Sequence, residues 1–426
     1  MKSKLWTRNF ILDTSINFLL YVIFYQLMLW STNYSIVTWH SSISEAGLAS
    51  GIFIIGALLS RIITGHIIDI LGRKKLLIIG TVLYLTAIPL YFSASTVILF
   101  FTVRCFHGIA YGISATAAST IIGAIVPADR RGEGIGYYAL GNTLASAAGP
   151  FLGITLCSGG NFSLNLYVCM ILAIVTLILS FLLHSPEHTC SAEEKKTLRK
   201  VSFNNFFAVR ALPISCISFL CGIAYSAVLS FMGAYADAQE LAAGGSLFFF
   251  AYALTSLFSR PITGHLLDRF GGNIVMYPTL IILALCMATL GLASSTTYFI
   301  LGGIFLGLSY STVTSAGQAL AIYGIPSNQI GLATSTFFVL IDLGVGIGPY
   351  MLGELVPAYG FSSVYYLACF IAIAAIPLYY ITIGRRGMFT LRWMHVVQRR
   401  VELHEKYAKA AASRHHIIPP SVSDSF

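Results

Sequence analysis

Two carboxyl groups stand inside long apolar stretches of this chain, where acids are rare. Asp342 lies seven residues before Pro349, and Asp13 lies four residues before Asn17. An apolar setting favours the neutral form of a carboxyl group and a neighbouring cation favours the ionised form, so such an acid can change its protonation state when its surroundings open or close. We predict that Asp342, or alternatively Asp13, binds and releases a proton in the working cycle. The competing interpretation of Asp342 is a structural ion pair.

Arg104 brings a positive charge into another apolar stretch, and His107 follows on nearly the same helical face. An arginine in the middle of a membrane helix is costly and should face a cavity or an acid. We predict that Arg104 takes part in proton coupling or in binding an anionic ligand. His107 either shares the proton or, in the alternative, hydrogen-bonds to a neighbouring helix.

Apolar stretches make up most of the molecule. Of 426 residues, 57% are hydrophobic and 10% are charged, and the mean hydropathy is +0.80. A soluble domain is roughly 25% charged, so this is an integral membrane protein. It is expected to be all-α, because no segment alternates with the period of a barrel strand and a spanning helix needs only about 20 apolar residues. Twelve transmembrane helices are predicted, over residues 9–32, 44–68, 76–94, 96–124, 132–158, 164–184, 210–236, 241–267, 274–293, 296–324, 328–355 and 361–383.

Basic side chains outside the predicted spans fall on one side of the membrane. In chain order they are Lys2, Lys4, Arg8, Arg73, Lys74, Lys75, Arg130, Arg131, Lys195, Lys196, Arg199, Lys200, Arg210, Arg269 and those from Arg385 to Arg414. The positive-inside rule then predicts that both termini are cytoplasmic. It also explains the net charge of +9 without nucleic acid as a partner.

The chain contains an internal repeat at an offset of 199 residues. Ser60–Asp69 (SRIITGHIID) returns as Ser259–Asp268 (SRPITGHLLD), and Gly149-Pro150 returns as Gly348-Pro349. A duplicated half predicts two pseudo-symmetric six-helix bundles that rock against each other. The charges have no counterpart in the other half, since Gly303, Thr143 and Leu212 stand opposite Arg104, Asp342 and Asp13.

These features divide the chain into four parts. We predict an N-terminal bundle at 1–184, a cytoplasmic linker at 185–209, a C-terminal bundle at 210–384 and a basic cytoplasmic tail at 385–426. The tail mixes apolar residues such as Met394 and Val397 with arginines, which is typical of an amphipathic helix on an anionic membrane surface. The eight cysteines show no paired spacing, so neither a metal site nor a disulfide set is expected.

One loop carries a specific motif. Gly65, Asp69 and Gly72, followed by Arg73 and Lys74, form the pattern Gly, three residues, Asp, two residues, Gly-Arg-Lys. This pattern closely resembles the signature loop of the major facilitator superfamily, and with the twelve spans and the duplicated half the resemblance covers residues 8–384. It implies the major facilitator fold, alternating access and a loop that latches the cytoplasmic side shut when the protein faces outward. The alternative is that these charges only anchor helix ends at the interface.

The second copy of the loop is less complete. It keeps Gly264, Asp268 and Arg269, but Gly272-Asn273 replaces the basic pair. We therefore expect the second latch to be weaker than the first.

Two further motifs resemble those of exporters. Arg104, with glycines four and eight residues later, resembles the fourth-helix motif of proton-driven exporters, and Gly149-Pro150 with Gly153 resembles the antiporter motif of export members. The sequence departs from the second motif at Ala145 and Ile154. Small residues here are expected to allow tight contact between the halves, and the proline bends the helix. The alternative is a kink that serves packing alone.

The resemblance also indicates cavity and gate residues. Spans two and eleven run side by side in this fold, so Arg61 is a candidate partner of Asp342 and part of the gate. Each tyrosine on a cavity-lining span offers a flat apolar face with a hydroxyl group, although packing between helices is the alternative role. Besides Arg104, the candidate cargo contacts are Tyr21, Tyr25, Gln26, Tyr111, Asn142, Tyr225 and Tyr310.

Together these features predict a secondary transporter of the bacterial inner membrane, not an enzyme. We expect a monomer that exports a small organic molecule in exchange for protons, without a cofactor, because no phosphate-binding loop is present. Arg104 favours an anionic or zwitterionic cargo, such as a metallophore or an acidic metabolite, over a cationic drug. The alternatives are a proton-coupled nutrient symporter, a lipid flippase and a sensor that does not transport. Membrane lipids, protons and the small molecule are the only partners expected.

Overall fold

The computed structural model describes residues 4–40, 43–157, 162–187, 207–326 and 329–390, with a few tail residues up to 403. The first half consists of α1 (Arg8–Trp39), α2 (Ile43–Leu71), α3 (Arg73–Leu90), α4 (Val97–Ile125), α5 (Arg131–Cys157) and α6 (Phe162–Leu182). The second half consists of α9 (Leu212–Ala238), α10 (Ala242–Phe270), α11 (Gly272–Gly291), α12 (Thr296–Ala321), α13 (Ile330–Gly353), the short α14 (Val356–Tyr359) and α15 (Phe361–Tyr379). Each predicted span corresponds to one long helix. Within the described residues, ten of these twelve helices are both long enough and apolar enough to cross a membrane. The remaining two, α5 and α10, do not meet this criterion of length and composition over their described residues.

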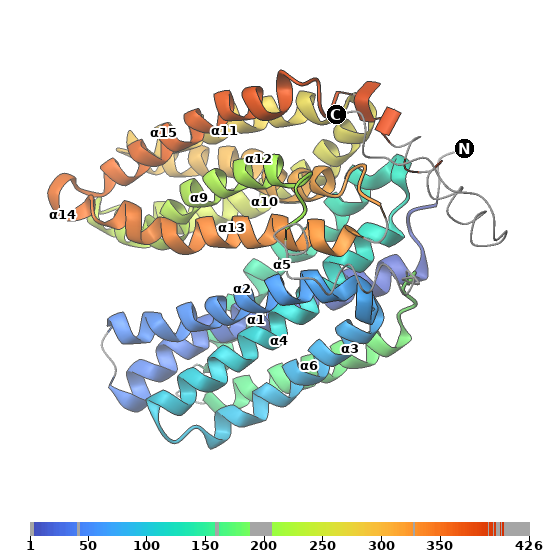
Figure 1. Cartoon of the computed structure of the whole chain (residues 1–426). Helices are drawn as coiled ribbons and strands as arrows, with labels where there is room; N and C mark the ends of the chain where they lie inside the picture. The colour runs from blue at the N-terminus through green and yellow to red at the C-terminus, as the bar shows by residue number, and fades with distance from the viewer. Residues whose placement is uncertain are drawn as a thin grey trace.

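The helices are apolar on nearly all sides, as expected for helices surrounded by lipid. Large apolar side chains on their outer faces, such as Phe250 and Phe370, are mostly exposed. Two bundles lie side by side, with the first half below the second in Figure 1. Each bundle has a core of its own, which contains Leu20 and Phe53 in the first half and Leu283 in the second.

The duplicated glycines at the ends of α2 and α10 have a backbone reason. Gly72 and Gly271 adopt φ angles of 97° and 88°, in a region that other residues rarely enter. Each glycine begins the next helix of its half, α3 or α11. These turns therefore require glycine whether or not the loop has a role in gating.

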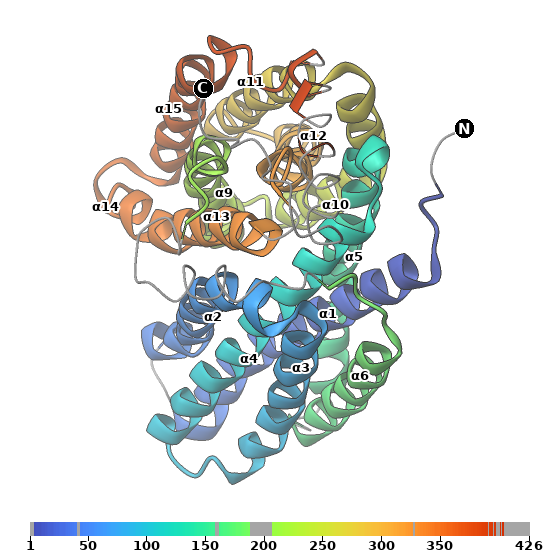
Figure 2. The same ribbon diagram turned by 45° about the vertical axis from the view of Figure 1, so that its right-hand side comes forward.

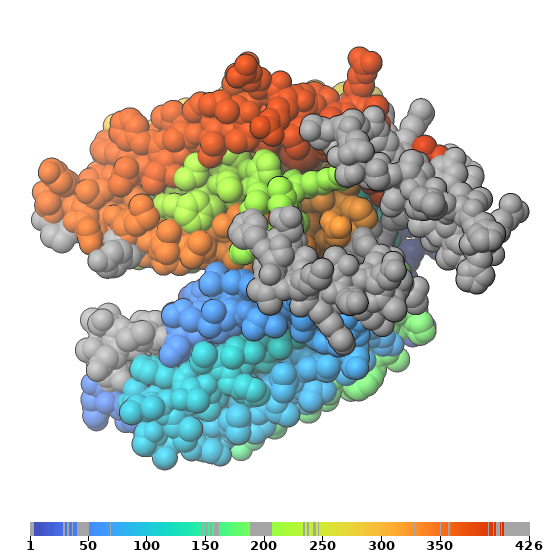
Figure 3. Space-filling view, viewed as in Figure 1, coloured from blue at the N-terminus to red at the C-terminus, as the bar shows by residue number. Residues whose placement is uncertain are grey.

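The halves meet near one end and separate toward the other. We call the first the basic end, because the loops that carry Arg73, Arg130 and Arg269 lie there. Near this end α2 packs against α13 and α5 crosses α10 (Figure 2). At the α14 end the space-filling view shows an opening between the halves (Figure 3).

The first part of the tail packs against the second half instead of extending along a membrane surface. The Phe389 carbonyl accepts a hydrogen bond of 2.8 Å from the Gly272 N–H, and the Met394 carbonyl accepts one of 3.4 Å from the Tyr323 hydroxyl. Met394 and Val397 are only 2% and 7% exposed. The membrane-surface prediction is wrong for these two side chains, because they are buried beside Tyr323 and Gly324, just after the end of α12. The rest of the tail, and linker residues 188–206, lie outside the described part.

Candidate functional site

Six tyrosines from both halves gather where the halves meet, and we call them the tyrosine cluster. They are Tyr21 and Tyr25 on α1, Tyr111 on α4, Tyr225 on α9, Tyr252 on α10 and Tyr310 on α12. Tyr225 and Tyr310 stack with ring centroids 3.8 Å apart, and the rings of Tyr21 and Tyr111 meet edge to face at 5.8 Å. Tyr252 is hydrogen-bonded to Tyr225 and lies near Tyr25 of the other half. Five of the six were predicted cavity residues, and the structure brings them together.

An ion pair joins the halves beside this cluster. Arg61 Nε on α2 lies 3.1 Å from Asp342 Oδ2 on α13. The Arg61 side chain is 3% exposed and that of Asp342 is 30% exposed. The guanidinium also lies over the rings of Phe338 and Tyr111, at 5.0 and 5.8 Å. The carboxylate is thus accessible to solvent while its partner is enclosed.

Arg260, which the repeat relates to Arg61, also reaches across to the other half. Its Nη1 donates to the carbonyl oxygen of Ala139 on α5, and its Nη2 lies 3.5 Å from Thr314 Oγ1. It interacts electrostatically with Tyr252 and Tyr25. No carboxylate pairs with it among the described residues.

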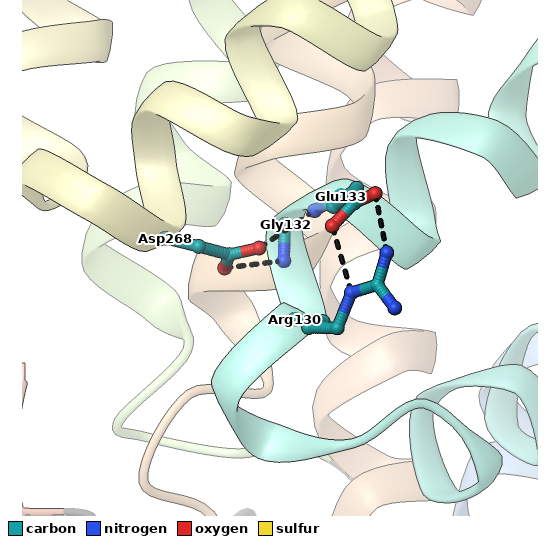
Figure 4. Close-up of polar contacts among 4 residues, drawn as sticks. All are labelled: Arg130, Gly132, Glu133 and Asp268. Carbon is teal, nitrogen blue, oxygen red and sulfur yellow. Dashed lines mark hydrogen bonds and ion pairs between the residues drawn. The ribbon is translucent and has the colours of Figure 1, made fainter. Parts of the chain in front are cut away.

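Asp268 forms a polar latch between the halves at the basic end. Its carboxylate accepts hydrogen bonds of 2.7 and 2.9 Å from the backbone N–H groups of Gly132 and Glu133, in the first turn of α5 (Figure 4). A helix N-terminus attracts an anion, because its first N–H groups lack partners within the helix. Arg130 donates two hydrogen bonds to Glu133, and this contact raises the pKa of Arg130. The second latch is therefore formed in this conformation.

The first loop makes contacts within its own half. The backbone N–H groups of Arg73 and Lys74 donate to the Glu187 carboxylate, both at 2.8 Å. The Arg73 guanidinium donates to the Pro186 carbonyl, and Lys74 Nζ donates to the Phe181 carbonyl. The Asp69 side chain lies outside the described part of the chain, so the relative strength of the two latches remains a prediction. The Arg269 side chain lies on the surface over Phe270.

Glycines allow close contact between the halves, but these glycines are not those of the antiporter-like motif. A Cβ on Gly132 would meet the Gly264 carbonyl oxygen at 2.5 Å, and a Cβ on Gly65 would collide with Ser335. Ser335 Oγ also donates to the Arg61 carbonyl at 2.6 Å. These contacts join α5 to α10 and α2 to α13.

The expectation that the Gly-Pro motifs pack the halves together is wrong. Gly149 approaches Tyr25 on α1, and Gly348 approaches Ser226 on α9. Both are contacts inside one half, because α1 and α5 are neighbours in the first bundle and α9 and α13 in the second. Pro349 lies within α13; the Pro150 side chain lies outside the described part.

Arg104 and His107 lie inside the first bundle. The Arg104 guanidinium lies over the Phe53 ring at 4.7 Å, and its Nη1 is 3.5 Å from the Tyr91 hydroxyl, which is 3.0 Å from His107 Nδ1. Gln26 donates to Asn165 on α6 at 2.7 Å. Each of these contacts is with a first-half residue, and the three side chains are buried.

Asp13 is the most enclosed acid in the described part of the chain. Its side chain is 0% exposed, and neither carboxyl oxygen has a hydrogen-bond partner among the described residues. One turn further along α1, Asn17 donates to Asn142 at 2.6 Å. An ionised carboxylate without a partner is very costly in such a place, so this geometry suits the neutral acid.

Sequence reasoning missed Tyr252 and assigned no role to Arg260. The repeat held a signal for Arg260, because it occupies the position of Arg61 in the second copy. Nothing comparable singled out Tyr252, which stands where the first half has Phe53.

A family model described as Major Facilitator Superfamily matches residues 11–296 and 242–392. The chain belongs to the major facilitator superfamily. It is therefore a multi-pass membrane transporter and not an enzyme, and the predicted twelve-helix fold is confirmed. The site described above lies where the two bundles of this major facilitator protein meet.

Known members show how far the likeness extends. The chain is 27% identical to an uncharacterized MFS-type transporter of Methanocaldococcus jannaschii, with 80% of this chain and 89% of that protein covered. It is 22% identical to the staphylopine export protein of Staphylococcus aureus, with 77% and 84% covered. Among solved structures, the fucose:proton symporter FucP of E. coli in its outward conformation superposes with a TM-score of 0.71 at 16% identity, covering 89% of this chain and 99% of FucP. The last comparison shows the shared fold alone.

Proposed function

We propose that this transporter exports a small organic molecule in exchange for protons, in the bacterial inner membrane with the basic end in the cytoplasm. The observation that carries the proposal is the ion pair between Arg61 and Asp342. It joins the two halves, and its carboxylate is 30% exposed while its arginine is enclosed. With this orientation the conformation is outward-facing, and the exposed acid is the one that a proton from outside reaches.

Protonation of Asp342 would weaken one tie between the halves. A neutral carboxyl group no longer attracts the buried guanidinium, so the contact between α2 and α13 loses its charge–charge component. The halves can then open at the basic end, where Asp342 releases its proton to the cytoplasm. Return of the charge restores the ion pair and favours the outward-facing form, now with cargo bound from the cytoplasm.

Export is supported by similarity rather than by geometry. The staphylopine export protein covers most of the chain, and the motif around Gly149-Pro150 resembles that of export members. The opening at the α14 end fits either direction of transport. The candidate cargoes are therefore a metallophore, an acidic metabolite and a drug.

Metabolite profiling of the growth medium, with and without the gene, would identify the cargo and the direction. We expect one or more compounds to be missing from the medium of cells without the gene. Accumulation of the compound inside cells that carry the gene would instead indicate an importer.

The identified compound then allows a test of coupling in inside-out vesicles with an acidic interior. We expect wild-type protein to accumulate it only while the pH gradient lasts, and Asp342→Asn to fall to near background. Glu240→Gln, which removes an exposed carboxylate at the α14 end of the molecule, should behave as wild type. Gradient-driven uptake by Asp342→Asn equal to wild type would contradict the assigned role of Asp342.

A further inference from the structure

Two arginines that the repeat relates to each other have different surroundings. Arg61 and Arg260 occupy matching positions in α2 and α10, both are buried, and both reach the opposite half. Arg61 has the carboxylate of Asp342 at 3.1 Å. Among the described residues, Arg260 has as hydrogen-bond partners the carbonyl of Ala139 and, at 3.5 Å, the hydroxyl of Thr314. The scaffold has thus kept a second cation without keeping a counter-ion for it.

The guanidinium of Arg260 has unused binding capacity. The side chain is 4% exposed, and its Nε has no hydrogen-bond partner among the described residues. A carbonyl and hydroxyl groups offer dipoles, whereas a buried guanidinium is best compensated by an anion that takes two of its N–H groups at once. The position therefore favours an anionic ligand whenever one can reach it.

The neighbours of Arg260 are suited to an organic anion. The tyrosines near its guanidinium are Tyr252, Tyr25, Tyr21 and Tyr310, all members of the tyrosine cluster. Tyrosine rings offer apolar faces to a carbon skeleton, and their hydroxyl groups hydrogen-bond to polar atoms. Tyrosine rings near a guanidinium that has no carboxylate partner among the described residues match a molecule with an apolar or aromatic body and a carboxylate.

Access to Arg260 depends on which end of the molecule is open. Ala139 belongs to α5 and Arg260 to α10, and these helices are in contact here because the basic end is closed. When the halves separate at the basic end, the Ala139 carbonyl moves away from the guanidinium. When they close again, the carbonyl competes with whatever has bound.

We propose that Arg260 is the receptor for a carboxylate of the cargo in the state open at the basic end, and that the Ala139 carbonyl displaces this carboxylate on closure. This inference rests on the proposed export function and names the charge class of its cargo. It assigns anion binding to Arg260 rather than to Arg104, which lies inside the first bundle. Release at the α14 end then follows from competition for one guanidinium.

Two dyes of similar ring structure and opposite charge test the proposal with purified full-length protein. The anionic probe is carboxyfluorescein and the cationic probe is tetramethylrhodamine ethyl ester, and fluorescence anisotropy measures the binding of each. We expect saturable binding of carboxyfluorescein that weakens at least about tenfold in Arg260→Gln, because a charge-assisted pair is lost. Arg260→Lys keeps the charge and should bind more tightly than Arg260→Gln. Arg386→Gln removes an exposed charge at the start of the tail and should match wild type.

Several outcomes would overturn the proposal. The first is that the wild-type protein binds only the cationic dye, or neither dye. The second is that Arg260→Gln binds carboxyfluorescein as tightly as the wild type does. The third is that Arg260→Lys and Arg260→Gln lose the same amount of affinity, which would indicate a structural role. If Arg260→Gln does not give a folded, monodisperse protein, Arg260→Met removes the charge with an apolar side chain of similar length. If anion binding depends on Arg260 but transport does not depend on a pH gradient, the result would support the role of Arg260 as the carboxylate receptor and contradict the proposed proton coupling.

Discussion

At the scale of single residues, two acids have opposite surroundings. Asp342 is partly exposed and paired with an arginine, whereas Asp13 is enclosed without a partner among the described residues. Of these two acids, Asp342 is the one that joins the two halves directly. For that reason we place the outside proton on Asp342, and we regard Asp13 as an acid that is neutral in this conformation and ionises only when the first bundle opens to water.

Replacement of Asp13 by asparagine tests that distinction. Because no hydrogen bond to the Asp13 carboxyl group exists among the described residues, Asp13→Asn should change the melting temperature by no more than about 2–4 °C. Gradient-driven transport should fall if Asp13 carries a second proton. A scanning fluorimetry measurement that shows a much larger loss of stability would mean that Asp13 has a structural partner.

At the scale of helices, contact between the halves at the basic end depends on glycine. Gly132 on α5 and Gly264 on α10 bring the two backbones together beside the Asp268 latch. The antiporter-like glycines act inside the bundles instead. The sequence identified Gly264 through the repeated loop and Gly149 through the antiporter-like motif, because glycine and its spacing are visible in a chain. It could not say which neighbour each glycine faces, because a helix presents several faces and the partner is fixed only by tertiary packing.

A methyl group at Gly132 should hold the basic end open. Its Cβ would lie 2.5 Å from the Gly264 carbonyl oxygen, and such crowding typically costs about 1–3 kcal/mol. That cost would shift the balance between the two conformations by about 5–150-fold. We expect spin labels at the α14 ends of the two halves to be closer together in Gly132→Ala than in wild type.

Gly346→Ala is the matched control, because a Cβ at that position would meet nothing within 4 Å. Its distance distribution should equal that of wild type. Identical distributions for both variants would show that the α5–α10 contact does not set the conformation.

At the scale of the whole molecule, the number and order of the spanning helices could be predicted from the long apolar runs, because each run needs only a membrane around it to form a helix. The tail prediction was wrong for Met394 and Val397 because amphipathic segments bury their apolar face against a membrane or against protein, and sequence alone does not distinguish the two surfaces. The proposed role of Arg260 was equally hidden, because the lack of a carboxylate partner among the described residues is a property of three-dimensional surroundings.

Docking of the tail should contribute to the stability of the second half. Met394 is buried against it whereas Val396, two residues later, is 45% exposed. Met394→Ser should destabilise the protein by about 2–5 kcal/mol, as for other truncations of buried side chains, and lower the melting temperature of detergent-solubilised protein. Val396→Ser should leave that temperature unchanged, and equal effects of the two substitutions would argue against docking.

The two cores differ in a way that bears on biosynthesis. The core that contains Leu20 and Phe53 is built only from the first half, whereas the large core of the second half includes Ile135 of α5. Ribosomes deliver the N-terminal part first, and domains generally fold as units in that order. The first bundle can thus pack while the second is still being translated, and it then presents part of the surface on which the second completes its core.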